Sequence, residues 1–201
     1  IYGSAELRAE GLGTKINGAT TTGDGGDTTG GNVVVSVSAT GGTINIGGLA
    51  QLTAHARSSS GAGAGSVGGL ATGGTAQILA QGGNITLGDA VLSANAFFGS
   101  GLVNSGLIQQ AGLSSVNADG GAITVNGSLN LDARSARDFT PLAVVGGVDA
   151  TGGTSTISAM NGSTITISGP VTQSASGLGG DANIGAAGIG RGGSATLRAV
   201  G

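Results

Sequence analysis

The chain has no cysteine and no tryptophan, and one tyrosine and three phenylalanines are its only aromatic residues. Without cysteine there are no disulfide bonds and no thiol chemistry. Because large rings are so few, the interior has to be filled by Ala, Val, Ile and Leu. Small aliphatic side chains suit a thin interior made of stacked repeats better than one wide globular core.

Charged residues are also scarce, at 8% of the 201 residues, and the formal net charge is −3. The seven cations are spread along the chain, at Arg8, Lys15, Arg57, Arg134, Arg137, Arg191 and Arg198. Nucleic-acid binding depends on clustered cations that neutralise phosphates, so we expect no nucleic-acid partner. No apolar run approaches the roughly 20 residues that span a bilayer, so we expect no membrane span. There is no signal-peptide pattern.

Glycine is abundant, with 45 residues, while proline contributes only 2. Such a composition approaches that of disordered low-complexity chains. Disorder, however, goes with low hydrophobicity and high net charge, and here the mean hydropathy is +0.29. The apolar residues also alternate with polar ones, which predicts folded β-structure.

One stretch, Gly82 to Ala96 (GGNITLGDAVLSANA), recurs along the chain. Copies of it stand at Gly41–Ala56, Gly120–Ala133 and Gly162–Ala175. The leading isoleucines of the four copies, Ile44, Ile85, Ile123 and Ile165, are separated by 41, 38 and 42 residues. A period near 40 residues is typical of repeat architectures.

Each repeat contains three runs in which apolar and polar residues alternate, a pattern that predicts strands with one buried face. The first runs are Ala5–Ala9, Val33–Ala39, Ala76–Ala80, Ser114–Ala118, Thr154–Ala159 and Ala195–Ala199. The second runs are Thr43–Ile46, Asn84–Leu87, Ala122–Val125 and Thr164–Ile167. The third runs are Leu49–Ala56, Ala90–Ala96, Leu129–Ala133 and Val171–Ala175.

The alternation predicts which side chains point inward. We expect inward files at Ile44, Ile46, Ile85, Leu87, Ile123, Val125, Ile165 and Ile167, and at Leu52, Leu92 and Leu131, continued by Thr172 or Gln173. We expect outward positions at Asn45, Thr86, Thr124 and Thr166. Met160 stands where a small residue is expected, so we predict a bulge or register change there.

The chain is therefore predicted to be all-β, a right-handed parallel β-helix (β-solenoid) of about five coils of roughly 40 residues with Gly-rich lateral loops. The loops are expected at 17–31, 57–74, 97–113, 134–153 and 176–193. The approximate units are 1–30, 31–73, 74–113, 114–152 and 153–193, with a partial unit at 194–201, and we interpret the whole as a single segment of a longer chain.

The phrases GGTINIGG, GGNITLGD and GGAITVNGSLNLDA resemble the β-helical shafts of filamentous-haemagglutinin-type and autotransporter-type bacterial adhesins. The resemblance covers most of Gly41 to Ala175, and the secretion domain of those families has no counterpart here. It implies a secreted or cell-surface location, a rod-like shape and a role in adhesion, biofilm or filament formation.

Few residues carry recognisable chemistry. Gly25-Gly-Asp27 and Gly179-Gly-Asp181 lack the nine-residue recurrence of a calcium-binding repeat, so we expect turn residues and no metal. His55, the only histidine, is expected to point outward between Ala54 and Ala56 without a catalytic or ligand role. We therefore expect no cofactor.

Two other functions stay open from the sequence. A polysaccharide-acting enzyme would use clustered Asp and Arg, and the densest charged stretch holds Asp132, Arg134, Arg137 and Asp138. An ice- or carbohydrate-binding module would use the outward threonines. The aspartates near strands, Asp89, Asp119 and Asp132, occupy different repeat positions, which favours a non-enzyme.

The leading hypothesis is thus a structural shaft whose partners are its neighbouring repeats, other copies joined end to end or laterally, and a cell-surface or glycan ligand. Ligand contact would run through the loops. The candidate contact residues are Phe97, Phe98, Leu102, Leu107 and Ile108, for which a small core under the loop is the alternative role.

Overall fold

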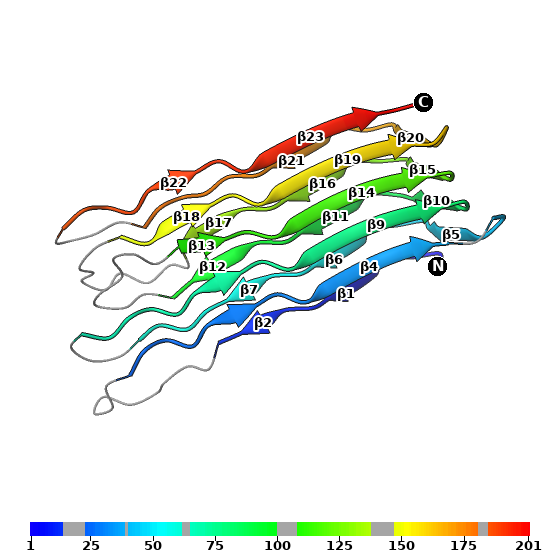
Figure 1. Ribbon diagram of the computed structural model, residues 1–201. Helices are drawn as coiled ribbons and strands as arrows, with labels where there is room; N and C mark the ends of the chain where they lie inside the picture. The colour runs from blue at the N-terminus through cyan, green and yellow to red at the C-terminus, as the bar shows by residue number, and fades with distance from the viewer. Residues whose placement is uncertain (14–22, 39, 62–64, 100–107, 138–146, 181–184) are drawn as a thin grey trace.

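The computed structural model describes residues 1–13, 23–38, 40–61, 65–99, 108–137, 147–180 and 185–201. The regular structure of these residues is entirely β, and none of them lies in a helix. The strands form five parallel sheets in which neighbouring strands are five apart in chain order, or four apart in the last passage, at β18–β22 and β19–β23 (Figure 1). The chain thus passes through the same sheets in the same order again and again, as in a β-solenoid, and the all-β prediction is confirmed.

Each sheet is named here by its first strand, and its members follow in spatial order. The β1 sheet contains β1 (Ala5–Arg8), β6 (Ala50–Thr53), β11 (Ala90–Ser93), β16 (Leu129–Asp132) and β21 (Val171–Ser174). The β2 sheet contains β2 (Gly11–Leu12), β7 (Ala56–Arg57), β12 (Ala96–Phe98) and β17 (Ser135–Arg137). The β3 sheet contains β3 (Thr28–Thr29), β8 (Ala71–Thr72), β13 (Ile108–Gln110), β18 (Asp149–Thr151) and β22 (Gly190–Arg191).

The two remaining sheets complete each passage of the chain. The β4 sheet contains β4 (Asn32–Val37), β9 (Thr75–Gln81), β14 (Leu113–Asp119), β19 (Thr154–Met160) and β23 (Ser194–Ala199). The β5 sheet contains β5 (Thr43–Ile46), β10 (Asn84–Leu87), β15 (Ala122–Val125) and β20 (Thr164–Ile167).

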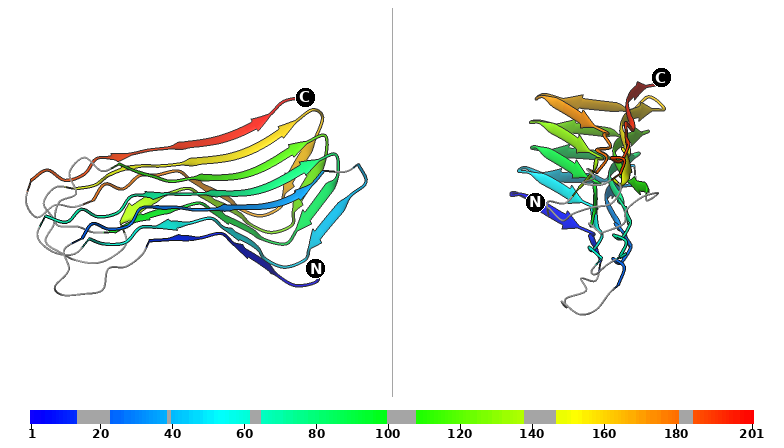
Figure 2. Two further views of the ribbon diagram at one scale, coloured as in Figure 1. Left: turned by 60° about the horizontal axis from the view of Figure 1, so that its bottom comes forward. Right: turned by 90° about the vertical axis from the view of Figure 1, so that its left-hand side faces the viewer.

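The sheets form two layers. The β1 sheet packs on the β4 sheet, the β2 sheet packs on the β3 sheet, and the β5 sheet closes one end of the sandwich (Figure 2). The turn from the β4 sheet into the β5 sheet uses a glycine at positive φ in every complete passage, at Gly41, Gly82, Gly120 and Gly162. Glycine adopts this conformation without the steric cost that a Cβ would bring.

The larger interior lies between the β1, β4 and β5 sheets. Its side chains form files, sets of residues paired across successive parallel strands. The files of the β5 sheet are Ile44, Ile85, Ile123, Ile165 and Ile46, Leu87, Val125, Ile167. The central members are buried and the outer members pack against them, so the predicted inward files are confirmed. In the β1 sheet, Leu52, Leu92 and Leu131 are continued by Gln173.

The two layers are drawn together by a repeated hydrogen bond across the interior. In every passage, a glycine N–H just before the β4-sheet strand donates to the carbonyl of an alanine just after the β1-sheet strand. The pairs are Gly31–Ala9 (2.9 Å), Gly74–Ala54 (2.9 Å), Gly112–Ala94 (2.8 Å), Gly153–Ala133 (2.9 Å) and Gly193–Ala175 (2.7 Å). Four of these five glycines end a Thr-Gly-Gly or Arg-Gly-Gly phrase, and the five bonds form a constriction that separates two cores.

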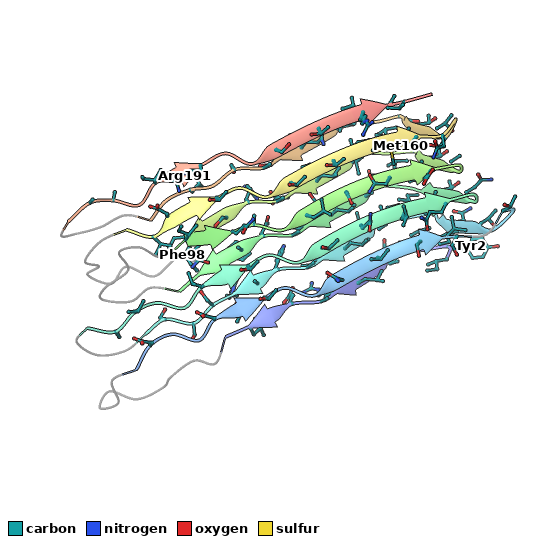
Figure 3. The ribbon with its side chains drawn as sticks, in the orientation of Figure 1. Tyr2, Phe98, Met160 and Arg191 are labelled. Atoms are coloured by element: carbon teal, nitrogen blue, oxygen red, sulfur yellow. The ribbon has the colours of Figure 1, made fainter. Side chains whose placement is uncertain are left out.

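Beyond the constriction, the β2 and β3 sheets enclose a smaller core rich in Ala, Ser and Gly. Among the described residues, Phe98 is the largest apolar side chain of this core and is 2% exposed (Figure 3). Ser58 Oγ donates to the carbonyl of Gly69 (2.6 Å). The buried amide of Gln109 accepts from the N–H of Ala71 and donates to Gly69 O (3.3 Å). The stretches expected as lateral loops are therefore partly short strands with an interior of their own.

Two local expectations were wrong. Ala5–Arg8 was assigned to the first runs, but it pairs with Ala50–Thr53 and belongs with the third runs. The expected irregularity at Met160 is absent, because Ala159 continues the alanine file and Met160 pairs regularly with Asp119. The turn that follows Met160 is one residue longer than the equivalent turn after Asp119, and Asn161 within it has a φ of 55°.

Candidate functional site

The predicted contact residues do not form one surface. Phe98 is buried, as the alternative of a small core requires, while Ile108 is 56% exposed on the β3 sheet. Phe97 is half-buried and points to the opposite side of β12 from Phe98. Leu102 and Leu107 lie outside the described residues.

The aspartates considered for calcium bind the backbone of the neighbouring repeat. Asp24 accepts a hydrogen bond from Val67 N (2.8 Å), and Asp27 accepts one from Leu70 N (2.7 Å). The expected role as turn residues is not what the structure shows, because each carboxylate joins two repeats across 43 residues of the chain. Within the described ranges, no three His, Asp or Glu side chains are close enough to hold a metal ion. Asp181 lies outside these ranges.

The aspartates considered for sugar cleavage are dispersed. Asp89 accepts hydrogen bonds from Ser128 N (2.7 Å) and Ser128 Oγ (2.8 Å). These bonds favour the carboxylate and lower the pKa of Asp89 below its usual value. Asp119 instead accepts from the side-chain amide of Asn161 (2.6 Å).

Polar and charged side chains gather on the outer face where the β1 sheet meets the β2 sheet. One file along this corner is Arg8, Thr53, Ser93, Asp132 and Ser174. A second, set between the two sheets, contains Glu10, His55, Asn95 and Arg134. The alanines flanking His55, Ala54 and Ala56, are fully buried, so His55 points outward as expected.

These side chains form a hydrogen-bond network across neighbouring repeats. His55 Nε2 lies 2.6 Å from Ser93 Oγ, which also accepts from Asn95 Nδ2 (3.1 Å). Asn95 Nδ2 donates to Asp132 Oδ2 (2.9 Å), and Asn95 Oδ1 accepts from Arg134 N (2.7 Å). Arg134 Nε and Nη2 bind the two oxygens of Asp132 at 2.6 and 2.7 Å. Asn95 is only 4% exposed and Asp132 8%, so the centre of the network is removed from water, while the Arg134 side chain at its edge is 52% exposed.

The pKa values of His55 and Arg134 are shifted in opposite directions. Burial disfavours the imidazolium and lowers the pKa of His55 below 6.5, against the smaller opposing effect of the Glu10 and Asp132 charges. The hydrogen bond to Asp132 raises the pKa of Arg134 above its usual value. Asp132 and Arg134 thus come together as the enzyme hypothesis requires. However, both carboxylate oxygens of Asp132 are already occupied, which suits a structural pair better than a general base.

A pocket of about 240 Å³ opens beside this network. Its lining, the corner pocket, consists of Arg8, Glu10, Gly11, Leu12, His55, Arg57 and Phe97. The Phe97 ring meets the His55 ring edge-to-face, with centroids 5.4 Å apart and an interplanar angle of 79°. The Arg57 guanidinium carbon lies 5.4 Å from the Phe97 centroid, a cation–π arrangement.

Sequence reasoning found Phe97 but missed the corner pocket. Glu10, His55 and Phe97 come from three different repeats and meet only through the parallel register. The available signal was that a charged or aromatic residue comes just after the third run in three of the four copies, at Arg57, Phe97 and Arg134.

The outward threonines of the β5 sheet do align. Asn45, Thr86, Thr124 and Thr166 form one file. The other outward file is Thr43, Asn84, Ala122 and Thr164. Only β20 therefore presents a Thr-x-Thr pair, and the regular threonine array that ice binding would need is interrupted.

Comparison with protein-family models, with curated proteins and with solved structures finds no match to this chain. The described residues include no helix that is long and apolar enough to cross a membrane.

Proposed function

We propose that this chain is a shaft segment of a large secreted or cell-surface bacterial protein of the adhesin type. The fold would be a right-handed β-solenoid of about five coils. The segment itself performs no catalysis and takes no cofactor. It holds other parts of the protein, or its own glycan-binding surface, away from the cell.

The observation that carries this proposal is that the two edges of the stack present strands of the same sheets. One edge presents β1, β3 and β4, and the other presents β21, β22 and β23, members of the same three sheets. The chain ends lie at these opposite edges (Figure 1). Because every sheet is parallel, a further repeat added at either edge continues each hydrogen-bond ladder without a change of register.

The edges also support self-association as the partner interaction. On β23, Leu197 continues the inward file of Ile157 and is 77% exposed at the open edge. Unpaired parallel edges with apolar side chains template further strands. End-to-end contact between copies, or with neighbouring repeats of a longer protein, would satisfy both edges.

The test is to insert further copies of residues 75–153 directly after Gly153, since Thr75 and Thr154 occupy equivalent positions. Small-angle scattering and electron microscopy should then find a rod that lengthens by about 4.8 Å for each strand added to a sheet. Antibodies against the segment should label intact cells of its source. Globular or aggregated products, or labelling only after lysis, would overturn the proposal.

A further inference from the structure

We propose that the corner pocket binds a single uncharged sugar ring of a surface glycan. This inference rests on the proposed adhesin role, because it assigns a ligand site to the adhesin. The pocket is a defined set of side chains, so glycan binding can fail while the role as a shaft stands.

The size of the pocket limits its ligand. Sites for drug-sized molecules span about 300–1,000 Å³, whereas the corner pocket encloses about 240 Å³. It therefore admits one ring-sized group and leaves the rest of an extended ligand outside. The pocket lies on the outer face of the sheets, where a glycan chain can continue past it.

The lining combines apolar and polar groups in the way a sugar requires. Phe97 and the exposed side chain of Leu12 offer apolar surface to the C–H face of a ring. Glu10 is an acceptor and Arg57 a donor for hydroxyl groups. A hydroxyl both donates and accepts, so a polyol can bind both side chains at once.

Charge favours an uncharged ligand over an anion. Arg8, the second cation of the lining, forms ion pairs with Glu6 and, at 3.7 Å, with Glu10. Within this group of Arg8, Arg57, Glu6 and Glu10, two positive charges meet two negative ones. A sulfate, phosphate or carboxylate would either have to displace Glu10 from Arg8 or bind close to the negative charge of Glu10.

The pocket wall is held in place before any ligand arrives. His55 is fixed by its contact with Ser93 and by its T-shaped contact with the Phe97 ring. Phe97 in turn lies against Arg57. A wall held by such contacts loses little side-chain freedom on binding, which is the condition for measurable affinity from a small contact area.

The test is a titration of the isotopically labelled chain, followed by two-dimensional NMR. The probes are the methyl glycosides of glucose, galactose, mannose and N-acetylglucosamine, with sodium sulfate and sodium acetate as anionic comparators. We expect saturable shifts for at least one glycoside, confined to the residues around Glu10, His55 and Phe97.

Variants E10Q and R57Q should weaken that binding by about tenfold or more each, since each removes a charged hydrogen-bond partner. The matched control is R198Q, because Arg198 is an arginine on β23 in a different sheet. Absence of saturation by every glycoside, binding of the anions alone, or equal binding by all three variants would overturn the inference. Lengthening of the rod by inserted repeats would be unaffected, so the two proposals fail separately.

Discussion

The N–H of Gly112 donates a 2.8 Å hydrogen bond to the carbonyl of Ala94, across the interior from one sheet layer to the other. The same bond recurs in every repeat, and the layers lie so close here that a Cβ at Gly73 would stand 2.5 Å from the same carbonyl oxygen of Ala94. A Cβ at Gly112 would collide with the carbonyl oxygen of Gly74 in the neighbouring repeat. Glycine is therefore a requirement of the constriction and not a mark of flexibility.

Replacing Gly112 with Ala should destabilise the fold by about 1–3 kcal/mol, the usual cost of overpacking a close-packed interior. The midpoint of urea unfolding measures the effect. The control is G192A, because a Cβ at Gly192 meets no atom within 4 Å. Equal unfolding midpoints for the two variants would show that the constriction tolerates a side chain.

The leucine file of the β1 sheet should behave as a close-packed core. Leu92 is fully buried between Leu52 and Leu131, so L92A should cost about 2–5 kcal/mol through lost burial and the cavity left behind. The neighbouring outward residue, Val91, is only half-buried, and V91A should cost much less. Urea unfolding of both variants compares them, and similar losses would contradict the assigned faces of β11.

The strands of the larger core could be predicted because their signal is local. An alternating run such as Asn84–Leu87 between glycine turns defines both the strand and its buried face. The identity of the sheet was harder to assign. Ala5–Arg8 matches Ala195–Arg198 in its spacing of Ala and Leu, but Gly47 and Gly48 bind the backbone of Ile1 and Gly3. These contacts place Ala5–Arg8 in the β1 sheet, and pattern alone does not reveal them.

The smaller core and the corner pocket could not be predicted for a related reason. Strands such as Ala71–Thr72 are two residues long and pack against Gly, Ser and Ala, so no apolar alternation marks them. The contact between His55 and Ser93 joins positions two residues apart in adjacent repeats. Predicting this contact requires the register between repeats, and the register cannot be read from the sequence because the repeats differ in length.

The unfolding free energy should depend on pH through His55. Because the folded pKa is lowered below 6.5, the unfolded chain takes up the proton first as the pH falls. The stability contributed by neutral His55 is therefore complete above pH 6.5 and is lost as the pH falls from there toward the folded pKa.

The charges that act on His55 are Glu10 and Asp132, which raise its pKa, and Arg57 and Arg8, which lower it. For the native chain, the urea midpoint should decrease as the pH is lowered from about 8 to about 5. The fall should be smaller for H55Q, which keeps a hydrogen-bonding side chain. Identical pH profiles would exclude His55 as the source.

The stability that the hydrogen-bond network of His55, Asn95 and Arg134 contributes should depend on Asp132. The D132A variant leaves Asn95 and the guanidinium of Arg134 without their partner, and it should cost about 1–3 kcal/mol. The control is N130A on the same strand, because Asn130 is exposed. Comparable urea midpoints for D132A and N130A would show that the network contributes no measurable stability.

The repeat register makes one prediction about the whole fold. Thr75 and Leu113 pair in β9 and β14, so deleting residues 75–112 joins Gly74 to Leu113 with every sheet still in register. This deletion should give a shorter, cooperatively folded β-protein. Deleting residues 75–113 moves β14 by one position, which turns its buried side chains toward solvent. Circular dichroism, size-exclusion chromatography and urea unfolding should find the first variant folded and monodisperse and the second unfolded or aggregated. If both fold equally well, stacking does not depend on the inward files, and the register ceases to explain the fold.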